Sequence, residues 1–342
     1  MPELAIDTSE LTRRFRETVA VDRLDVDVPA GELFGLVGPD GAGKSTLIRM
    51  LATVLVPTSG DATVLGHSIV REPHAIKSRI GYMSQKFSLY GDLTVAENLE
   101  FFARLRGVPK AERAVRSKRL LEFAGLSGFE SRHAQFLSGG MKQKLALAAT
   151  LIHEPELIFL DEPTTGVDPV SRREFWRIIS DLHRRGITVV VATPYMDEAE
   201  RCGQIAFMES GRILVRDTPA GLKARVPGVL YEVMAEDYQG AVRALCGMPG
   251  ILSAEPYGEM VRAVSAHDGG PDEAAIEAGL REAHVAARSV RRAPVSMETA
   301  FAMLVRRSGE QAEAVLADIA AGRDDVGELV PAAGDTGDGD AS

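Results

Sequence analysis

The chain has 342 residues, of which 45% are hydrophobic and 26% are charged, a composition that is ordinary for a globular protein. Its net charge of −10 argues against bulk nucleic acid as the main partner. Its apolar runs, such as residues 157–160 and 189–192, are far shorter than the ~20 residues of a membrane-spanning helix, and we expect no secretory signal at the N-terminus.

The first expected element is a small antiparallel sheet. Apolar and polar residues alternate in short runs over residues 4–28, and a turn at 29–32 closes the segment. A buried strand at 33–37 then leads into a glycine-rich loop. A helix is expected from 44 to 55, and a further strand follows at 62–66.

The glycine-rich loop has the pattern G-x-x-x-x-G-K-S/T between a strand and a helix, which is typical of phosphate binding. Glycines allow backbone N–H groups to approach the phosphates, Lys44 supplies a positive charge, and Ser45 offers a hydroxyl to magnesium. We expect Asp40 to point outward, because an anion buried beside a triphosphate would be costly. The expected nucleotide-binding residues are Gly38, Pro39, Asp40, Gly41, Ala42, Gly43, Lys44, Ser45 and Thr46.

The middle of the chain reads as helices followed by core strands. Residues 93–128 have a helical pattern, and a helix over 138–152 opens with a serine and two glycines. Strands at 157–160 and 188–192 are expected in a parallel sheet, separated by a helix over 169–185.

Two carboxylates, Asp161 and Glu162, end the strand at 157–160. Adjacent side chains on a strand leave in different directions, so one can hold magnesium while the other faces a phosphate. The alternative is a pair that caps the following turn.

A second unit is expected after a boundary near residues 219–226. The predicted order is β-α-β-β-α-β, which suggests a small ferredoxin-like module. A packing or dimerisation role is favoured over ligand sensing. An acidic tail that begins near Asp324 is expected to be disordered and solvated rather than functional. The predicted strands are 228–235, 251–256, 260–265 and 284–290, and the predicted helices are 239–246, 271–283 and 296–307.

Three motifs occur in one order: the phosphate loop, the segment Leu-Ser-Gly-Gly-Met at 137–141, and the strand that ends in Asp161 and Glu162. In this combination the chain resembles the ATP-binding subunits of ABC transporters. The resemblance implies an α/β fold with a P-loop ABC ATPase core, in which a mixed sheet flanked by helices joins an antiparallel β subdomain and a helical signature subdomain. We therefore expect a nucleotide-binding domain over 1–222 with its helical subdomain at about 93–152, an accessory α+β domain over 226–308, and a helix remnant with the acidic tail over 309–342.

The resemblance also implies roles for residues near the phosphates. Asp161 and Ser45 organise Mg²⁺, and Glu162 polarises the attacking water as general base. Gln85 matches the Q-loop, which touches magnesium and leads to the surface that faces the membrane subunit. ATP and Mg²⁺ are thus the expected cofactors, with Glu162 and Gln85 as the catalytic residues.

Further roles carried over from the family concern the rest of the nucleotide and a second subunit. Ser138, Gly139 and Gly140 match the signature that binds the γ-phosphate of ATP held by another ABC ATPase domain. Asp168 matches the acidic position of the D-loop. Phe15 matches the aromatic residue that stacks on adenine, although a core phenylalanine is the competing interpretation.

Segments 141–144 and 195–202 resemble bacterial exporters of drugs, polyketides or lipids. The implied partners are a membrane-spanning permease, expected to bind through residues 85–98, and a second ATPase domain in a homo- or heterodimer, at the cytoplasmic face of the membrane. Two cysteines without a metal or disulfide pattern fit a reducing cytoplasm. The alternative class is a non-transport ABC ATPase of translation or DNA repair, which the single set of motifs disfavours.

The family pattern is broken at Pro194. ABC ATPases usually place a histidine there that hydrogen-bonds the γ-phosphate, whereas proline has neither a side-chain donor nor a backbone N–H. Two interpretations stay open. Either Glu162 suffices and hydrolysis is slow, or this chain is the largely non-hydrolysing, regulatory half of an asymmetric pair.

Overall fold

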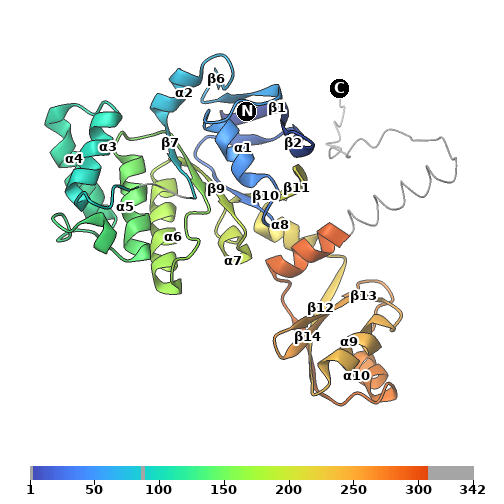
Figure 1. The fold of residues 1–342 in the computed structure, drawn as a ribbon. Coiled ribbons are helices and arrows are strands. Elements are labelled where there is room, and N and C mark those ends of the chain that lie inside the picture. The colour runs from blue at the N-terminus through green and yellow to red at the C-terminus, as the bar shows by residue number, and fades with distance from the viewer. Residues whose placement is uncertain (1–2, 86–88, 307–342) are drawn as a thin grey trace, which may run out of the picture.

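The structure is a computed structural model that describes residues 3–85 and 89–306 (Figure 1). The predicted tail, residues 309–342, and Arg307 of the last predicted helix lie outside the described residues. Among the residues that are described, no helix combines the length and the apolar character needed to cross a membrane.

A five-stranded antiparallel sheet forms from the N-terminal segment, as predicted. Its order is β2-β1-β5-β6, and β3 pairs with β1. Ile6 and Leu11 of β1 are buried in the core, and register shifts interrupt a strict alternation of buried and exposed residues along the strand. The strands are β1 (Leu4–Phe15), β2 (Thr18–Leu24), β3 (Asp27–Pro29), β5 (Ser59–Val64) and β6 (His67–Ser68).

The central sheet has six strands in the order β11-β10-β4-β9-β8-β7, and all neighbours are parallel except the β10–β11 pair. Along β8, Leu157 and Phe159 face one core cluster while Ile158 and Leu160 face the other. Burial of both faces explains the continuous apolar runs of these strands. The strands are β4 (Leu33–Val37), β7 (Ile80–Met83), β8 (Leu157–Asp161), β9 (Thr188–Thr193), β10 (Gln204–Glu209) and β11 (Arg212–Asp217).

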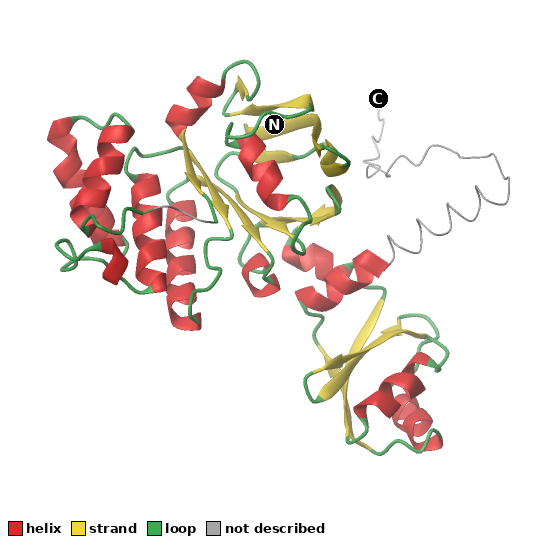
Figure 2. Ribbon diagram, in the orientation of Figure 1, coloured by secondary structure: helices red, strands yellow, loops and turns green. Residues whose placement is uncertain are grey.

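Helices cover both faces of the central sheet, and α3, α4 and α5 gather beyond its β7 edge (Figures 1 and 2). Thr94 and Glu97 form a capping box that starts α3. The helices of the cassette are α1 (Lys44–Leu51), α2 (Pro73–Arg79), α3 (Val95–Leu105), α4 (Lys110–Phe123), α5 (Gly139–Leu151), α6 (Pro169–Arg184), α7 (Met196–Ala199) and α8 (Pro219–Ala224), with a 3₁₀ turn at Ala134–Phe136.

The helix predicted over 44–55 is shorter in the structure, where α1 ends at Leu51. Thr53 adopts a left-handed φ of 57°, and the N–H groups of Val54 and Leu55 both donate to the carbonyl of Arg49. These bonds close the end of the helix before the chain turns toward Pro57.

The C-terminal module is a four-stranded antiparallel sheet in the order β13-β14-β12-β15, with two helices packed on one face. This is the ferredoxin-like order that was predicted. The last strand begins later than expected, at Ala287 rather than 284, because His284 takes a left-handed φ of 59° in the turn after α10. The elements are β12 (Gly228–Ala235), α9 (Tyr238–Cys246), β13 (Ile251–Tyr257), β14 (Met260–Ala266), α10 (Glu273–Glu282) and β15 (Ala287–Ala293).

A final helix, residues 297–306, lies between the module and the cassette (Figure 1). One side of it, with Met297, Phe301 and Leu304, packs into the cassette core, and the ring centroids of Phe301 and Phe207 are 5.0 Å apart. The other side, with Ala300 and Met303, packs on the sheet of the module. The helix therefore joins the two units.

Candidate functional site

The phosphate loop connects β4 to α1, and close approach of the backbone explains two of its glycines. A Cβ at Gly38 would lie 2.0 Å from the carbonyl oxygen of Met208. A Cβ at Gly43 would lie 2.2 Å from the carbonyl oxygen of Ala20. Gly43 also has a φ of 103°, which L-residues rarely adopt. Only glycine fits at these two positions, whereas Asp40 is exposed.

Lys44 is the buried cation of this loop, with 3% of its surface exposed. Its Nζ donates to the carbonyl oxygens of Gly38 and Pro39, at 2.7 and 2.8 Å. Burial lowers the pKa of Lys44, against the opposing influence of nearby carboxylates, of which Glu162 is the strongest. The ammonium group is thereby held across the loop that is expected to receive phosphates.

Ser45 and Asp161 meet although they lie far apart in the sequence. The Ser45 hydroxyl donates to Asp161 Oδ1 at 2.6 Å. Asp161 is fully buried, and its Oδ2 has no hydrogen-bond partner among the residues that the structure describes. Burial raises the pKa of the Asp161 carboxyl, with the Ser45 hydrogen bond as the main opposing influence. A buried carboxylate oxygen without a partner, beside a hydroxyl oxygen, fits a hard cation such as Mg²⁺.

Glu162 follows Asp161 and turns out of the strand with a left-handed φ of 49°. Its Oε2 accepts hydrogen bonds from Gln85 Nε2 at 2.8 Å and from Thr165 Oγ1 at 3.2 Å. Its backbone N–H donates to the carbonyl of Ala192 at 2.9 Å. The structure thus brings Gln85, at the end of β7, to Glu162, at the end of β8.

The signature segment starts α5. Ser138 is the N-cap, and its Oγ accepts from the N–H of Met141 at 3.3 Å. A Cβ on Gly140 would lie 2.4 Å from the Ser171 side chain, so glycine allows α5 to pack closely on α6. In the described ranges no hydrogen bond joins Ser138, Gly139 or Gly140 to the phosphate loop of the same chain.

Asp168 caps α6: its Oδ1 accepts from the N–H groups of Val170 and Ser171, at 3.0 and 2.9 Å. The hydrogen bonds from Ser171, followed by that from Val170, lower the pKa of Asp168. This carboxylate is exposed at the surface.

Phe15 is exposed rather than in the core, with 43% of its surface accessible. The guanidinium of Arg13 lies 4.5 Å from the centroid of its ring, and Arg13 Nη1 donates to the carbonyl of Val56 at 2.7 Å. An exposed ring supported on one face is suited to stacking on a planar base.

Sequence reasoning missed a buried carboxylate, Glu198, on α7. It is 1% exposed and accepts hydrogen bonds from the hydroxyls of Thr164 and Thr193, the latter at 2.6 Å. In the sequence Glu198 is distinguished only by its position, four residues after Pro194. Nothing local indicates that this residue is buried.

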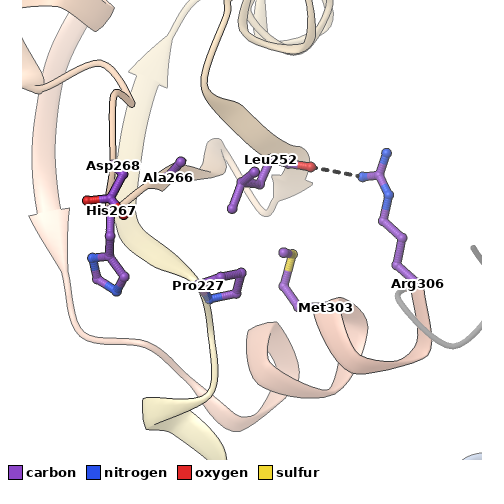
Figure 3. A pocket seen from close by; sticks show the side chains of 7 residues that line it. All are labelled: Pro227, Leu252, Ala266, His267, Asp268, Met303 and Arg306. Atoms are coloured by element: carbon purple, nitrogen blue, oxygen red, sulfur yellow. Dashed lines mark hydrogen bonds between the residues drawn. The ribbon is translucent and has the colours of Figure 1, made fainter. Parts of the chain in front are cut away.

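The cavity of about 530 Å³ shown in Figure 3 lies between the C-terminal module and the helix at 297–306, and none of the site residues described above lines it. Arg306 Nη1 donates to the carbonyl of Leu252 at 3.3 Å at its rim. No phosphate-loop residue contributes to it. Its lining consists of Pro227, Leu252, Ala266, His267, Asp268, Met303 and Arg306.

Comparison with known proteins agrees with the resemblance to ABC transporter ATP-binding subunits. A family model described as ABC transporter matches residues 21–165. Over 255 residues the chain is 41% identical to the daunorubicin/doxorubicin resistance ATP-binding protein DrrA of Streptomyces peucetius. The aligned region covers 74% of this chain and 76% of DrrA. Over 298 residues it is 37% identical to a daunorubicin resistance ATP-binding protein of Streptomyces coeruleorubidus, and this aligned region covers 84% of this chain and 93% of that protein.

Other relatives are matched over a smaller share. The chain is 46% identical over 223 residues to the probable multidrug ABC transporter ATP-binding protein YbhF of Escherichia coli (strain K12), and it spans only 39% of the length of that protein. Among solved structures, a dimeric ATP-binding cassette in a post-hydrolysis state bound to ADP and Pi superimposes with a TM-score of 0.58 and 26% identity, covering 62% of this chain and 98% of the other. By its sequence motifs, its fold and its relatives, the chain belongs to the family of ABC transporter ATP-binding proteins.

Proposed function

We propose that this chain binds ATP with Mg²⁺ and hydrolyses it to power export of a small molecule or lipid through separately encoded membrane subunits. The observation that carries the proposal is the meeting of Lys44, Ser45, Asp161 and Glu162 at the carboxyl ends of β4 and β8. Ligands of open α/β sheets bind at this edge. The names of DrrA and YbhF, a drug-resistance and a multidrug protein, support the class of cargo.

Each side chain has a defined task in the proposed reaction. Lys44 exchanges its two carbonyl partners for the β- and γ-phosphates. Ser45, Asp161 and Gln85 would hold the metal ion, which would supply positive charge to the site. Glu162 accepts a proton from the attacking water as general base, while its bonds from Gln85 and Thr165 fix its direction.

A second ATPase domain completes the site in this proposal. The N-terminus of α5, with Ser138 and two glycines, is a suitable anion site that has no hydrogen bond to the phosphate loop of its own chain within the residues described. We assign it to the γ-phosphate of ATP held by the partner domain. The dimeric state of the related solved cassette supports this arrangement.

The proposed docking site of the membrane subunit is a cavity of about 360 Å³ between the end of β7 and the start of α5. Tyr90 lies between the lining residues Leu89 and Gly91 and is 49% exposed, and its ring centroid lies 4.6 Å from that of Phe101, which is 36% exposed. Gln85 and Gly139 both line the cavity, so a segment seated there would touch Gln85 and the signature together. This contact would place the chain at the cytoplasmic face of the membrane.

Nucleotide binding by the purified full chain tests the proposal most directly. A titration with Mg²⁺ and a non-hydrolysable ATP analogue should show saturable binding. Lys44→Ala should weaken it by about a hundredfold or more, because the variant loses the cation that faces the phosphates. Lys77→Ala, which removes an exposed lysine on α2, is the matched control and should bind as the parent does. Equal affinity of the parent and Lys44→Ala would remove the assignment of the phosphate loop.

A largely regulatory role in an asymmetric pair is the second candidate, and Pro194 is the observation that favours it. The two candidates differ in whether a histidine at this position raises turnover.

A further inference from the structure

Glu198 is a buried carboxylate whose two oxygens bind hydroxyls from two different segments. Thr164 Oγ1, in the loop after β8, donates to Oε1. Thr193 Oγ1, at the end of β9, donates to Oε2 at 2.6 Å. The guanidinium of Arg172 on α6 lies 3.7 Å from Oε1. A carboxylate that is only 1% exposed is costly to bury, and these three partners offset the cost for Glu198.

Both segments that Glu198 holds lead to Glu162. On the first route, Thr164 adjoins Thr165, whose hydroxyl donates to Glu162 Oε2 at 3.2 Å. On the second route, Thr193 adjoins Ala192, whose carbonyl accepts the Glu162 N–H at 2.9 Å. One carboxylate therefore fixes the neighbours of both the side chain and the backbone of Glu162.

Glu162 needs such support because its backbone is strained. Its φ of 49° lies in the left-handed region, which costs a non-glycine residue free energy. Strained conformations persist only where the surrounding structure holds them from several sides. Pro194 contributes no side-chain donor to this region, so Glu162 is positioned by the hydrogen bonds described above.

We propose that Glu198 is a positioning residue for the reaction at Glu162: by holding Thr164 and Thr193 together, it keeps the loop after β8 and the end of β9 in the arrangement that directs the Glu162 carboxylate. This inference rests on the proposed function for the chemical role of Glu162. The hydrogen bonds that it invokes are independent of that function.

The test compares full-chain variants that alter the hydrogen bonds of Glu198. Glu198→Gln keeps the size of the side chain but loses its charge and one acceptor. Thr193→Val and Thr164→Val remove single hydroxyls at constant shape, and Thr193→Ser and Thr164→Ser restore them. Thr193→Val also removes the acceptor of the Tyr195 N–H, which Thr193→Ser keeps. Because a small misplacement of a catalytic group is costly, we expect kcat for ATP to fall about tenfold to a hundredfold in the Gln and Val variants. The Kd for an ATP analogue should stay within about twofold, and the Ser variants should recover most of the loss.

A second readout does not depend on turnover. Hydrogen exchange of the Glu162 amide, which donates to Ala192, should be about tenfold faster in Glu198→Gln than in the parent, because local opening becomes easier. Combining Glu198→Gln with Thr193→Val should add little to the larger single effect, since both changes act on the contact between Glu198 and Thr193.

Thr8→Val is the matched control for loss of a buried hydroxyl. Thr8 Oγ1 donates to the carbonyl of Leu24 at 2.9 Å within the antiparallel sheet, and this variant should keep the parent kcat even if its melting temperature falls. Parent-like kcat and amide exchange in Glu198→Gln and Thr193→Val would overturn the inference, as would an equal loss of kcat in Thr8→Val. A parent chain that binds no ATP would instead refute the proposed function, while the exchange of the Glu162 amide would still decide whether Glu198 holds that residue.

Discussion

Replacing Pro194 with histidine should raise the ATPase rate of the chain. Pro194 is half-buried and directly follows Thr193, whose hydroxyl donates to Glu198 and accepts the N–H of Tyr195 at 3.1 Å. The backbone on both sides is thus held, and Ala192, two residues earlier, accepts the N–H of Glu162. A histidine at 194 therefore enters a region that is already ordered beside the proposed base.

The magnitude follows from the value of one positioned donor. Such a donor contributes roughly 2.7–4 kcal/mol to transition-state stabilisation, which corresponds to about a hundredfold to a thousandfold in rate. We expect kcat to rise by about a hundredfold, the lower end of this range. Loss of the proline ring should lower stability by about 0.4–1 kcal/mol, because the unfolded chain gains freedom. Activity and melting temperature should consequently move in opposite directions.

The assay is phosphate release by the purified full chain, alone and with its membrane subunits, at saturating ATP. Pro194→Ala is the control, since it removes the ring without adding a donor, and it should not exceed the parent rate. Brisk turnover by the parent that Pro194→His leaves unchanged would show that the missing donor has no consequence in this chain.

Three further predictions concern residues of the site. Glu162→Gln should bind ATP with parent affinity but stall before hydrolysis, because an amide cannot accept the proton; turnover at the parent rate would exclude Glu162 as the base. Burial raises the pKa of Asp161 above its ordinary 3.8, so this group stabilises the ligand-free fold at low pH, and that contribution is lost as the pH rises through the raised value. The Mg²⁺-dependent affinity for ATP should increase over the same interval, because the metal needs the carboxylate, and Asp161→Asn should abolish this pH dependence in titrations across the acid range. Gly140→Ala should leave ATP binding intact but prevent the proposed ATP-dependent dimerisation, as measured by size-exclusion chromatography, because its Cβ would lie 2.4 Å from Ser171; normal dimerisation would contradict the close packing of α5 on α6.

The phosphate loop and the strand that ends in Asp161 could be predicted because their determinants are local. A glycine-rich segment between an apolar strand and a helix allows few other structures. Strand ends were less accurate, since the position of β15 depends on the left-handed turn at His284. No strand was predicted for β11, an edge strand whose residues are all at least partly exposed and whose pattern has no clean alternation.

Contacts within the site could not be read in the same way. Gln85 and Glu162 are 77 positions apart, and only the pairing of β7 with β8 brings them together. The environment of Glu198 depends on three separate segments, so its burial is a property of the tertiary structure. An acidic residue beside exposed Asp197 gives no local sign of that burial.

The helix at 297–306 has a consequence for the order in which the protein can be assembled. Its Phe301 completes the packing around Phe207 of the cassette, and its Met303 completes the packing of the module. Because synthesis runs from the N-terminus and domains generally fold as units, both units can form before this helix leaves the ribosome. The packing of the two units against each other through this helix has to wait until the helix has been synthesised. A chain interrupted between Ala293 and Met297 would contain two nearly finished units with apolar seams exposed on each, a state that quality-control machinery is suited to detect.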